Sequence, residues 1–205
     1  MQVVILGAMT GAARTPFGPD ARLPARRTLE DRVIVRWPRL YAALSRVGSR
    51  LPPRSRIRRA LLRRATLSAW GAWARGDIDL TLVRLAPGFH IELQPEWVAA
   101  GMRSSYEGHA GVRERAVDQH EVWQRMEFIP QELVDAGDVL VVLGSYHVRA
   151  RGSGIEFNSP IGSVLWLERG LIVREHDFGS WEEALRVAGV TASTGSAPSG
   201  VTSGP

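Results

Sequence analysis

The sequence predicts an α+β domain in which a bent antiparallel sheet wraps around helices, with a basic helical extension before it. Three runs between residues 139 and 178 alternate apolar and polar side chains with the period of two that is typical of strands. Turns containing glycine, at 151–154 and 168–170, separate these runs, and a short amphipathic helix follows. Helical stripes precede the strands instead of alternating with them, which favours the α+β class.

The middle run, residues 155–167, has one face that is apolar except for two hydroxyls. The residues of this parity are Ile155, Phe157, Ser159, Ile161, Ser163, Leu165 and Leu167. Because alternate residues of a strand point to the same side of a sheet, they should share one surface. We interpret this surface as the inside of a pocket.

Composition excludes several classes of protein. The 205 residues include no cysteine, so disulfides and thiolate metal sites are excluded and a reducing, cytoplasmic location is the expectation. No apolar run approaches the roughly 20 residues of a membrane-spanning helix, and the first residues lack the basic start of a signal peptide. The five histidines have no metal-ligand spacing, and no metal or cofactor is predicted.

Positive charge is concentrated near the N-terminus. All 26 basic residues are arginine, and residues 1–66 hold fifteen of them against three acidic residues, a balance of +12. The remaining residues carry −7. Complete replacement of lysine by arginine is typical of a coding bias, so the arginines alone do not indicate a phosphate site.

Residues 28–65 are predicted to form a basic amphipathic helical arm. Thr28 is a helix N-cap, and an apolar stripe follows, interrupted at Pro38. A second helix is expected over about 54–73, ending before Gly76. The stripe consists of Val33, Trp37, Leu40 or Tyr41, Leu44, Ile57 and Leu61. Residues 1–27 are expected to be a loose extension, and residues 191–205 a disordered tail.

The arm has two interpretations. Its arginines could face nucleic acid or an anionic membrane, or they could form a solvated face that pairs with acidic residues. Nucleic acid is disfavoured because no groove-reading motif or stacking aromatic accompanies the arginines. We expect the arm to lay its stripe on its own domain or on the second subunit of a homodimer, with peripheral contact to an anionic membrane as the alternative.

Several motifs of residues 66–190 together resemble the SnoaL-like, polyketide cyclase-like branch of the nuclear transport factor 2-like superfamily. They are ARGD at 74–77, YEGHAG at 106–111, DAGDVLVV at 135–142, RGSGIE at 151–156, and GLIVR at 170–174 followed by WEEAL at 181–185. The resemblance implies a cone-shaped α+β barrel with a hydrophobic pocket, often dimeric. The superfamily includes cyclases, isomerases, epoxide hydrolases, dehydratases and pocket proteins without known chemistry, so the fold does not select a function.

The resemblance also implies site residues. Cyclases and epoxide hydrolases of the superfamily place an acid/base aspartate where this chain has Asp177. The epoxide-hydrolase Arg-x-Asp pair falls instead on Gly144 and Tyr146. The ketosteroid-isomerase base, oxyanion tyrosine and protonated aspartic acid fall on Leu93, Ala69 and Ser163, which argues against isomerisation by that route.

From the residues themselves, a carboxylate near the end of a strand inside the cone should be desolvated and have a raised pKa. Asp177 is therefore the candidate acid/base, with hydroxyls of Tyr146 and Ser163 as hydrogen-bond donors to a substrate oxygen. The expected apolar walls are Trp73, Phe89, Ile91 and Ile161. The alternative is that Asp177 pairs with an arginine such as Arg149 or caps the last helix.

The function expected from these observations is that of a pocket protein for a small hydrophobic, carbonyl-bearing molecule. It would act on this molecule as a cofactor-independent cyclase, lyase or hydrolase. The alternative is a non-catalytic ligand-binding or dimerisation module.

Overall fold

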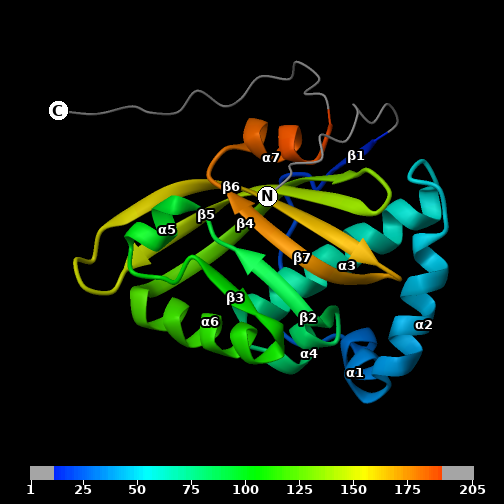
Figure 1. Cartoon of the computed structure of the whole chain (residues 1–205), viewed down its shortest axis with the longest axis horizontal. Coiled ribbons are helices and arrows are strands. Elements are labelled where there is room, and N and C mark those ends of the chain that lie inside the picture. The colour runs from blue at the N-terminus through cyan, green and yellow to red at the C-terminus, as the bar shows by residue number, and fades with distance from the viewer. Residues whose placement is uncertain (1–11, 191–205) are drawn as a thin grey trace.

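The computed structural model describes residues 12–190, which build one curved seven-stranded sheet with helices on both faces (Figure 1). The strand order is β1-β4-β5-β6-β7-β2-β3. The strands are β1 (Ala13–Pro16), β2 (Leu85–Glu92), β3 (Ser105–Glu107), β4 (Trp123–Asp135), β5 (Val139–Ala150), β6 (Glu156–Glu168) and β7 (Leu171–Phe178). The predicted α+β class and bent sheet are thus confirmed.

One pair of strands departs from the predicted antiparallel pattern. Strands β4 to β7 form consecutive antiparallel hairpins, but β2 pairs with β7 in parallel. A tight turn forces antiparallel pairing, whereas the long connection between β2 and β7 leaves the direction free. The parallel pair brings Ile91 of β2 opposite Glu175 of β7.

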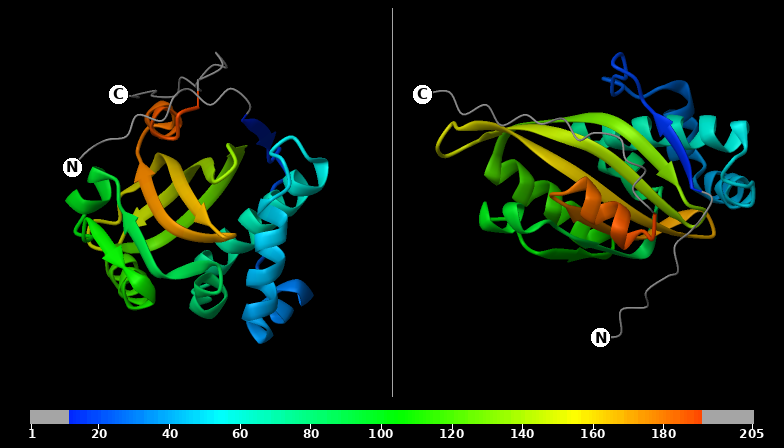
Figure 2. Two further views of the ribbon diagram at one scale, coloured as in Figure 1. Left: turned by 45° about the vertical axis from the view of Figure 1, so that its right-hand side comes forward. Right: turned by 90° about the horizontal axis from the view of Figure 1, so that it is seen from above.

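The helices divide between the two faces of the sheet, as the left view of Figure 2 shows. They are α1 (Leu29–Arg36), α2 (Pro38–Ser49), α3 (Arg56–Ala74), α4 (Ile78–Leu82), α5 (Pro95–Ala99), α6 (Gly108–Val122) and α7 (Trp181–Val187). The concave face packs against α3, α4 and α6, while α7 covers the other face over Val141, Leu143 and Val164. The chain therefore has two hydrophobic cores, one on the concave face and one beneath α7. Successive side chains of β5 point alternately into the first and the second core.

The face of β6 that carries the apolar residues is buried only near the middle of the strand. Ser159, Ile161, Ser163 and Leu165 are buried, but Ile155 and Phe157 are 62% and 43% exposed. The expectation that this whole face lines a pocket is therefore wrong at its N-terminal end. The β5–β6 hairpin projects past the helices that cover the concave face, so its first residues are covered only in part (Figure 1). Phe157 meets the Trp123 ring edge-on, at 5.9 Å between centroids.

Part of the extension predicted to be loose is an ordered edge strand. Residues 13–16 pair with residues 132–135 of β4, and Arg14 forms an ion pair with Glu132 at 2.6 Å. Phe17 follows and is buried in the concave core. The free backbone groups along β4 explain the pairing, because an edge strand accepts any suitable extended segment. Residues 1–11 and the tail from 191 lie outside the described residues.

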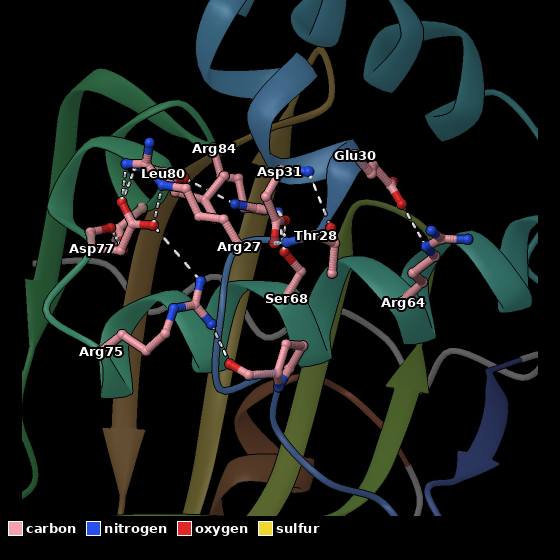
Figure 3. Close-up of polar contacts among 12 residues, drawn as sticks. Arg27, Thr28, Glu30, Asp31, Arg64, Ser68, Arg75, Asp77, Leu80 and Arg84 are labelled. Carbon is pink, nitrogen blue, oxygen red and sulfur yellow. Dashed lines mark hydrogen bonds and ion pairs between the residues drawn. The ribbon is translucent and has the colours of Figure 1, made fainter.

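Polar contacts join the N-terminal arm to the domain of the same chain (Figure 3). Thr28 caps α1 in a reciprocal box with Asp31. The buried Asp31 carboxylate accepts a hydrogen bond from Ser68 of α3 and faces Arg84 at 3.7 Å. Glu30 pairs with Arg64 of α3, within the arm itself. The contacts of Asp31 agree with the expectation that the arm docks on its own domain.

Most of the apolar stripe of the arm is exposed to solvent in the described chain, although it was expected to be covered. Its residues, Val33, Trp37, Leu40, Leu44, Ile57 and Leu61, are between 44% and 66% exposed. The side of α1 turned to the domain instead presents Asp31 and Ile34, and α2 buries no residue. Tyr41, the alternative member of the stripe, does pack on the domain core, beneath the Arg84 guanidinium. Contact of the exposed stripe residues with a second subunit or a membrane stays a prediction.

Candidate functional site

A cluster of charged side chains lies between the concave face of the sheet and helix α6. Its centre is Asp177 on β7, which is 1% exposed. The neighbouring strand β6 places Ser163 directly beside it, and the Ser163 hydroxyl donates a hydrogen bond of 2.5 Å to Asp177 Oδ1. A short bond from a fixed hydroxyl holds the carboxylate in one orientation.

Arg115 of α6 supplies the positive charge of the cluster. Its Nη2 lies 3.3 Å from Asp177 Oδ2, and its Nη1 lies 3.8 Å from Glu175 Oε1. The guanidinium also stacks over the Trp73 ring of α3, 4.8 Å from the ring centroid. One arginine thus faces two carboxyl groups that stand two residues apart on the same strand.

Burial dominates the ionisation of both carboxyl groups. It raises the pKa of Glu175 to about 8, and the adjacent Asp177 charge adds to this effect while Arg115 opposes it. Burial also raises the pKa of Asp177, against the opposing influence of Arg115 and of the Ser163 hydrogen bond. Two close carboxyl groups cannot both ionise easily, so the pair retains a proton near neutral pH.

Two cavities adjoin the cluster. The inner cavity, of about 60 Å³, is lined by Phe89, Trp73, Tyr146, Arg115 and Glu175 among others. The outer cavity, of about 220 Å³, shares its Trp70, Trp73 and Tyr146 walls with the inner one. Its other lining residues come from α6, β4 and the segment from the end of α3 to the start of α4. Asp177 is not among the lining residues of either cavity. The charged residues that line the inner cavity are therefore Glu175, Arg115 and Arg84.

Only some of the residues predicted to bind a substrate line a cavity. Tyr146, Trp73 and Phe89 line the inner cavity, as expected for substrate-binding walls. Ser163 is turned to Asp177 and so is not a free donor toward a ligand. Ile91 and Ile161 are fully buried in the concave core and line neither cavity.

Asp177 does pair with an arginine, as one structural alternative expected, but the partner is Arg115 and not Arg149, which lies 3.6 Å from Glu156. The other alternative, that Asp177 caps the last helix, is not seen. Ser180 caps α7 by accepting a hydrogen bond from the backbone of Glu183. Burial raises the pKa of the Tyr146 phenol, which therefore stays protonated and remains a potential donor.

Sequence reasoning missed Glu175 and Arg115. Glu175 could have been found, because it shares the parity of Asp177 on a strand whose inner face was already assigned. Arg115 gave no such signal, since α6 carries too few apolar residues to indicate which of its sides is inward. Within residues 12–190, no group of three histidine or acidic side chains is arranged to hold a metal ion.

The arrangement of the sheet and helices is that of a nuclear transport factor 2-like fold. Comparisons with protein-family models and with curated proteins found no match. An NTF2-like protein from Burkholderia pseudomallei K96243 is similar in structure, with 23% identity over 60% of this chain and 94% of that one and a TM-score of 0.53.

Two further solved structures are similar. TerC, co-crystallized with polyporic acid, has 23% identity over 56% of this chain and 87% of its own, with a TM-score of 0.51. An NTF2-like protein from Burkholderia thailandensis E264 has 24% identity over the same shares, with a TM-score of 0.50. The predicted nuclear transport factor 2-like fold is confirmed, and at these identities the likeness concerns the fold alone.

Proposed function

We propose that this chain is a SnoaL-like pocket protein and an acid–base catalyst that needs no cofactor. Its substrate is a small hydrophobic molecule bearing a carbonyl group, and its reaction is of the cyclase, lyase or hydrolase class. The observation that carries the proposal is the placement of Glu175 and Arg115 on the wall of an apolar cavity, with Asp177 directly behind them.

In this proposal Glu175 exchanges the proton. Near neutral pH its carboxyl group is protonated and donates that proton to the substrate oxygen as negative charge develops there. Arg115 stabilises the same charge, and its orientation is fixed by Asp177 and by the Trp73 ring. The Glu175 carboxylate then takes up the proton that the attacking group, a hydroxyl or acidic carbon of the substrate or a water molecule, loses as it bonds to the carbonyl carbon. Asp177 and Ser163 act as positioning residues.

The ligand class follows from the walls of the cavities. Aromatic rings of Trp73, Phe89 and Tyr146 supply apolar contact, and the charged pair supplies a few convergent polar groups. TerC, which is similar in fold, has been co-crystallized with an organic molecule, polyporic acid.

The test begins with identification of the ligand. Mass spectrometry of small molecules extracted from the purified protein, followed by turnover assays on a panel of hydrophobic carbonyl compounds, provides a substrate. Glu175→Gln should then lower kcat by at least about a hundredfold. The wild-type rate should fall as pH rises through about 8, where Glu175 loses its proton. Glu183→Gln, on the exposed side of α7, is the matched control.

Asp177→Asn distinguishes the role of Asp177 from that of Glu175. Removal of its negative charge should lower the pKa of Glu175 and move the alkaline limb of the rate profile to lower pH. If Glu175→Gln retains the rate while Asp177→Asn abolishes it, Asp177 is the acid/base, as the resemblance implies. If no compound is turned over and the extracted ligand binds wild type and Glu175→Gln equally, the chain is a binding module.

A further inference from the structure

Helix α2 is an amphipathic helix with no buried residue, and it runs along the outer edge of the molecule (Figure 1). Trp37, Leu40, Leu44 and Val47 recur along one of its sides and are 49% to 62% exposed. We call this side the α2 face. Ile57 and Leu61 of the adjoining α3 are exposed as well. Exposed apolar residues grouped in this way indicate a contact surface.

Arginines without ion-pair partners in the described chain flank the α2 face on one side. Residues 36–64 contain ten arginines and no acidic residue. Within the described chain, Arg58 and Arg64 form ion pairs, but Arg36, Arg39, Arg46 and Arg50 do not. The four arginines lie on or next to α2, three of them along the side that adjoins the apolar one. Their long stems allow the guanidinium groups to reach past an apolar contact.

The surface complementary to this pattern is apolar inside and negatively charged outside, as an anionic lipid layer is. A second copy of the chain is a poorer match. A two-fold contact through the α2 face would set the same unpaired arginines against one another. The other exposed apolar residues of the domain, such as Val117 and Ile129, lie on separate elements and offer no matching stripe.

We propose that the α2 face docks on an anionic phospholipid surface, with the apolar side of α2 entering the interface and the arginines contacting lipid headgroups. Within the described residues no helix is long and apolar enough to cross a bilayer, so α2 would lie in the plane of the surface.

Docking would set an open groove against the lipid. The groove, of about 310 Å³, is lined by Trp37, Leu40 and Leu44 on the arm and by Leu165, Leu167 and Ile172 on the sheet. The groove shares five wall residues with the inner cavity that holds Glu175 and Arg115, namely Ala69, Trp70, Arg84, Leu165 and Ile172. The α2 face is thus adjacent to the site where chemistry is proposed, although docking itself does not depend on that chemistry.

Sedimentation with vesicles tests the proposal on the full chain. The wild type should bind vesicles of phosphatidylcholine mixed with phosphatidylglycerol, bind pure phosphatidylcholine far more weakly, and lose binding as salt rises from about 50 to 500 mM. Arg39→Gln with Arg46→Gln should weaken binding roughly twenty-fivefold, at about fivefold for each arginine. Leu40→Gln with Leu44→Gln should weaken binding to both kinds of vesicle.

Matched controls carry the same chemical changes elsewhere. Arg113→Gln with Arg186→Gln removes two exposed arginines from α6 and α7, and Val117→Gln removes an exposed apolar residue of α6. These variants should bind anionic vesicles like the wild type, and circular dichroism verifies that every variant is folded. Equal loss of binding in the controls would show that total charge, and not the α2 face, is responsible.

Three other results would overturn the proposal. The first is a wild type that fails to bind anionic vesicles at low salt. The second is a dimer, seen by light scattering, that Leu40→Gln with Leu44→Gln dissociates without effect on vesicle binding; this would make the face a contact between copies. The third is salt-sensitive binding to duplex DNA without binding to vesicles, which would assign the arginines to nucleic acid.

Discussion

Arg58 of α3 and Asp135 of β4 form a buried, two-pronged ion pair, with distances of 2.7 Å from Nε to Oδ2 and 2.9 Å from Nη2 to Oδ1. The same guanidinium donates to the carbonyl oxygens of Ser49, Leu51 and Gly137. A single side chain therefore joins the end of α2, the helix α3 and the turn between β4 and β5.

Replacement of Arg58 by leucine should lower the free energy of unfolding by about 3–5 kcal/mol, because Asp135 would remain as a buried charge without its partner. Urea denaturation measures this change. The double variant Arg58→Leu, Asp135→Leu should recover most of the loss. Arg14→Gln, at the more exposed pair with Glu132, should cost less than about 1 kcal/mol. A similar loss for Arg14 and Arg58 would contradict the argument.

Gly170→Ala should destabilise the protein more than Gly137→Ala. Both glycines have positive φ, 81° and 88°, so both substitutions carry the backbone strain of about 1 kcal/mol. A Cβ at Gly170 would in addition overlap the Ser45 backbone of α2, whereas one at Gly137 meets no atom within 4 Å. The difference between the two unfolding free energies therefore measures how firmly the β6–β7 turn packs on α2. Equal losses of unfolding free energy for the two variants would mean that α2 can move away from a Cβ at position 170 without destabilising the protein.

Glu175 should make the protein less stable as pH rises. Its folded pKa of about 8 exceeds its ordinary value of 4.5, so the folded state binds the extra proton between these values and loses stability as pH increases through them. Denaturation from pH 5 to pH 9 should show a decline of roughly 1–3 kcal/mol that Glu175→Gln removes. Glu183→Gln should retain the decline. A flat wild-type profile would show that Glu175 ionises normally.

Asp31 should have the opposite pH dependence. Burial acts to raise its pKa, but hydrogen bonds from Ser68 and Thr28, together with Arg84, outweigh burial and lower it. The stabilising effect is therefore present above the ordinary value of 3.8 and is lost as pH falls below it. Asp31→Asn should cost about 1–3 kcal/mol at pH 7 and should hasten proteolysis in residues 28–50. Glu30→Gln, at an exposed pair, should change little.

Local signals explain why much of the fold was predictable. The turns at Gly137 and Gly170 need a left-handed conformation that glycine adopts readily, and Thr28 carries the side chain that caps a helix. Pairings between distant segments leave no such signal. The parallel contact of β2 with β7 and the pairing of residues 13–16 with β4 depend on how the whole sheet assembles.

Only the residues of the candidate site that lie on a strand could be predicted from the sequence. Period-two alternation assigns Asp177 to the inner face, and its buried position there agrees with that prediction. The same alternation extends to Glu175, which was overlooked. Arg115 comes from a helix on the opposite side of the cavity, and only the packing of α6 against β2 brings it within reach of β7. The acid/base role of Asp177 remains a prediction.

The short pairing of β1 with β4 also limits how the sheet can grow. The exposed edge of a sheet can recruit a strand from another molecule. Strand β1 occupies the β4 edge at residues 132–135, and the next bond runs from the Phe17 amide to the Gln131 carbonyl. Just beyond, the pairing of β4 with β5 is irregular between Pro130 and Glu132. Pro130 also has no amide hydrogen with which to pair another strand. Loss of residues 13–17 would uncover this edge, so these few residues protect the native chain against self-association into aggregates.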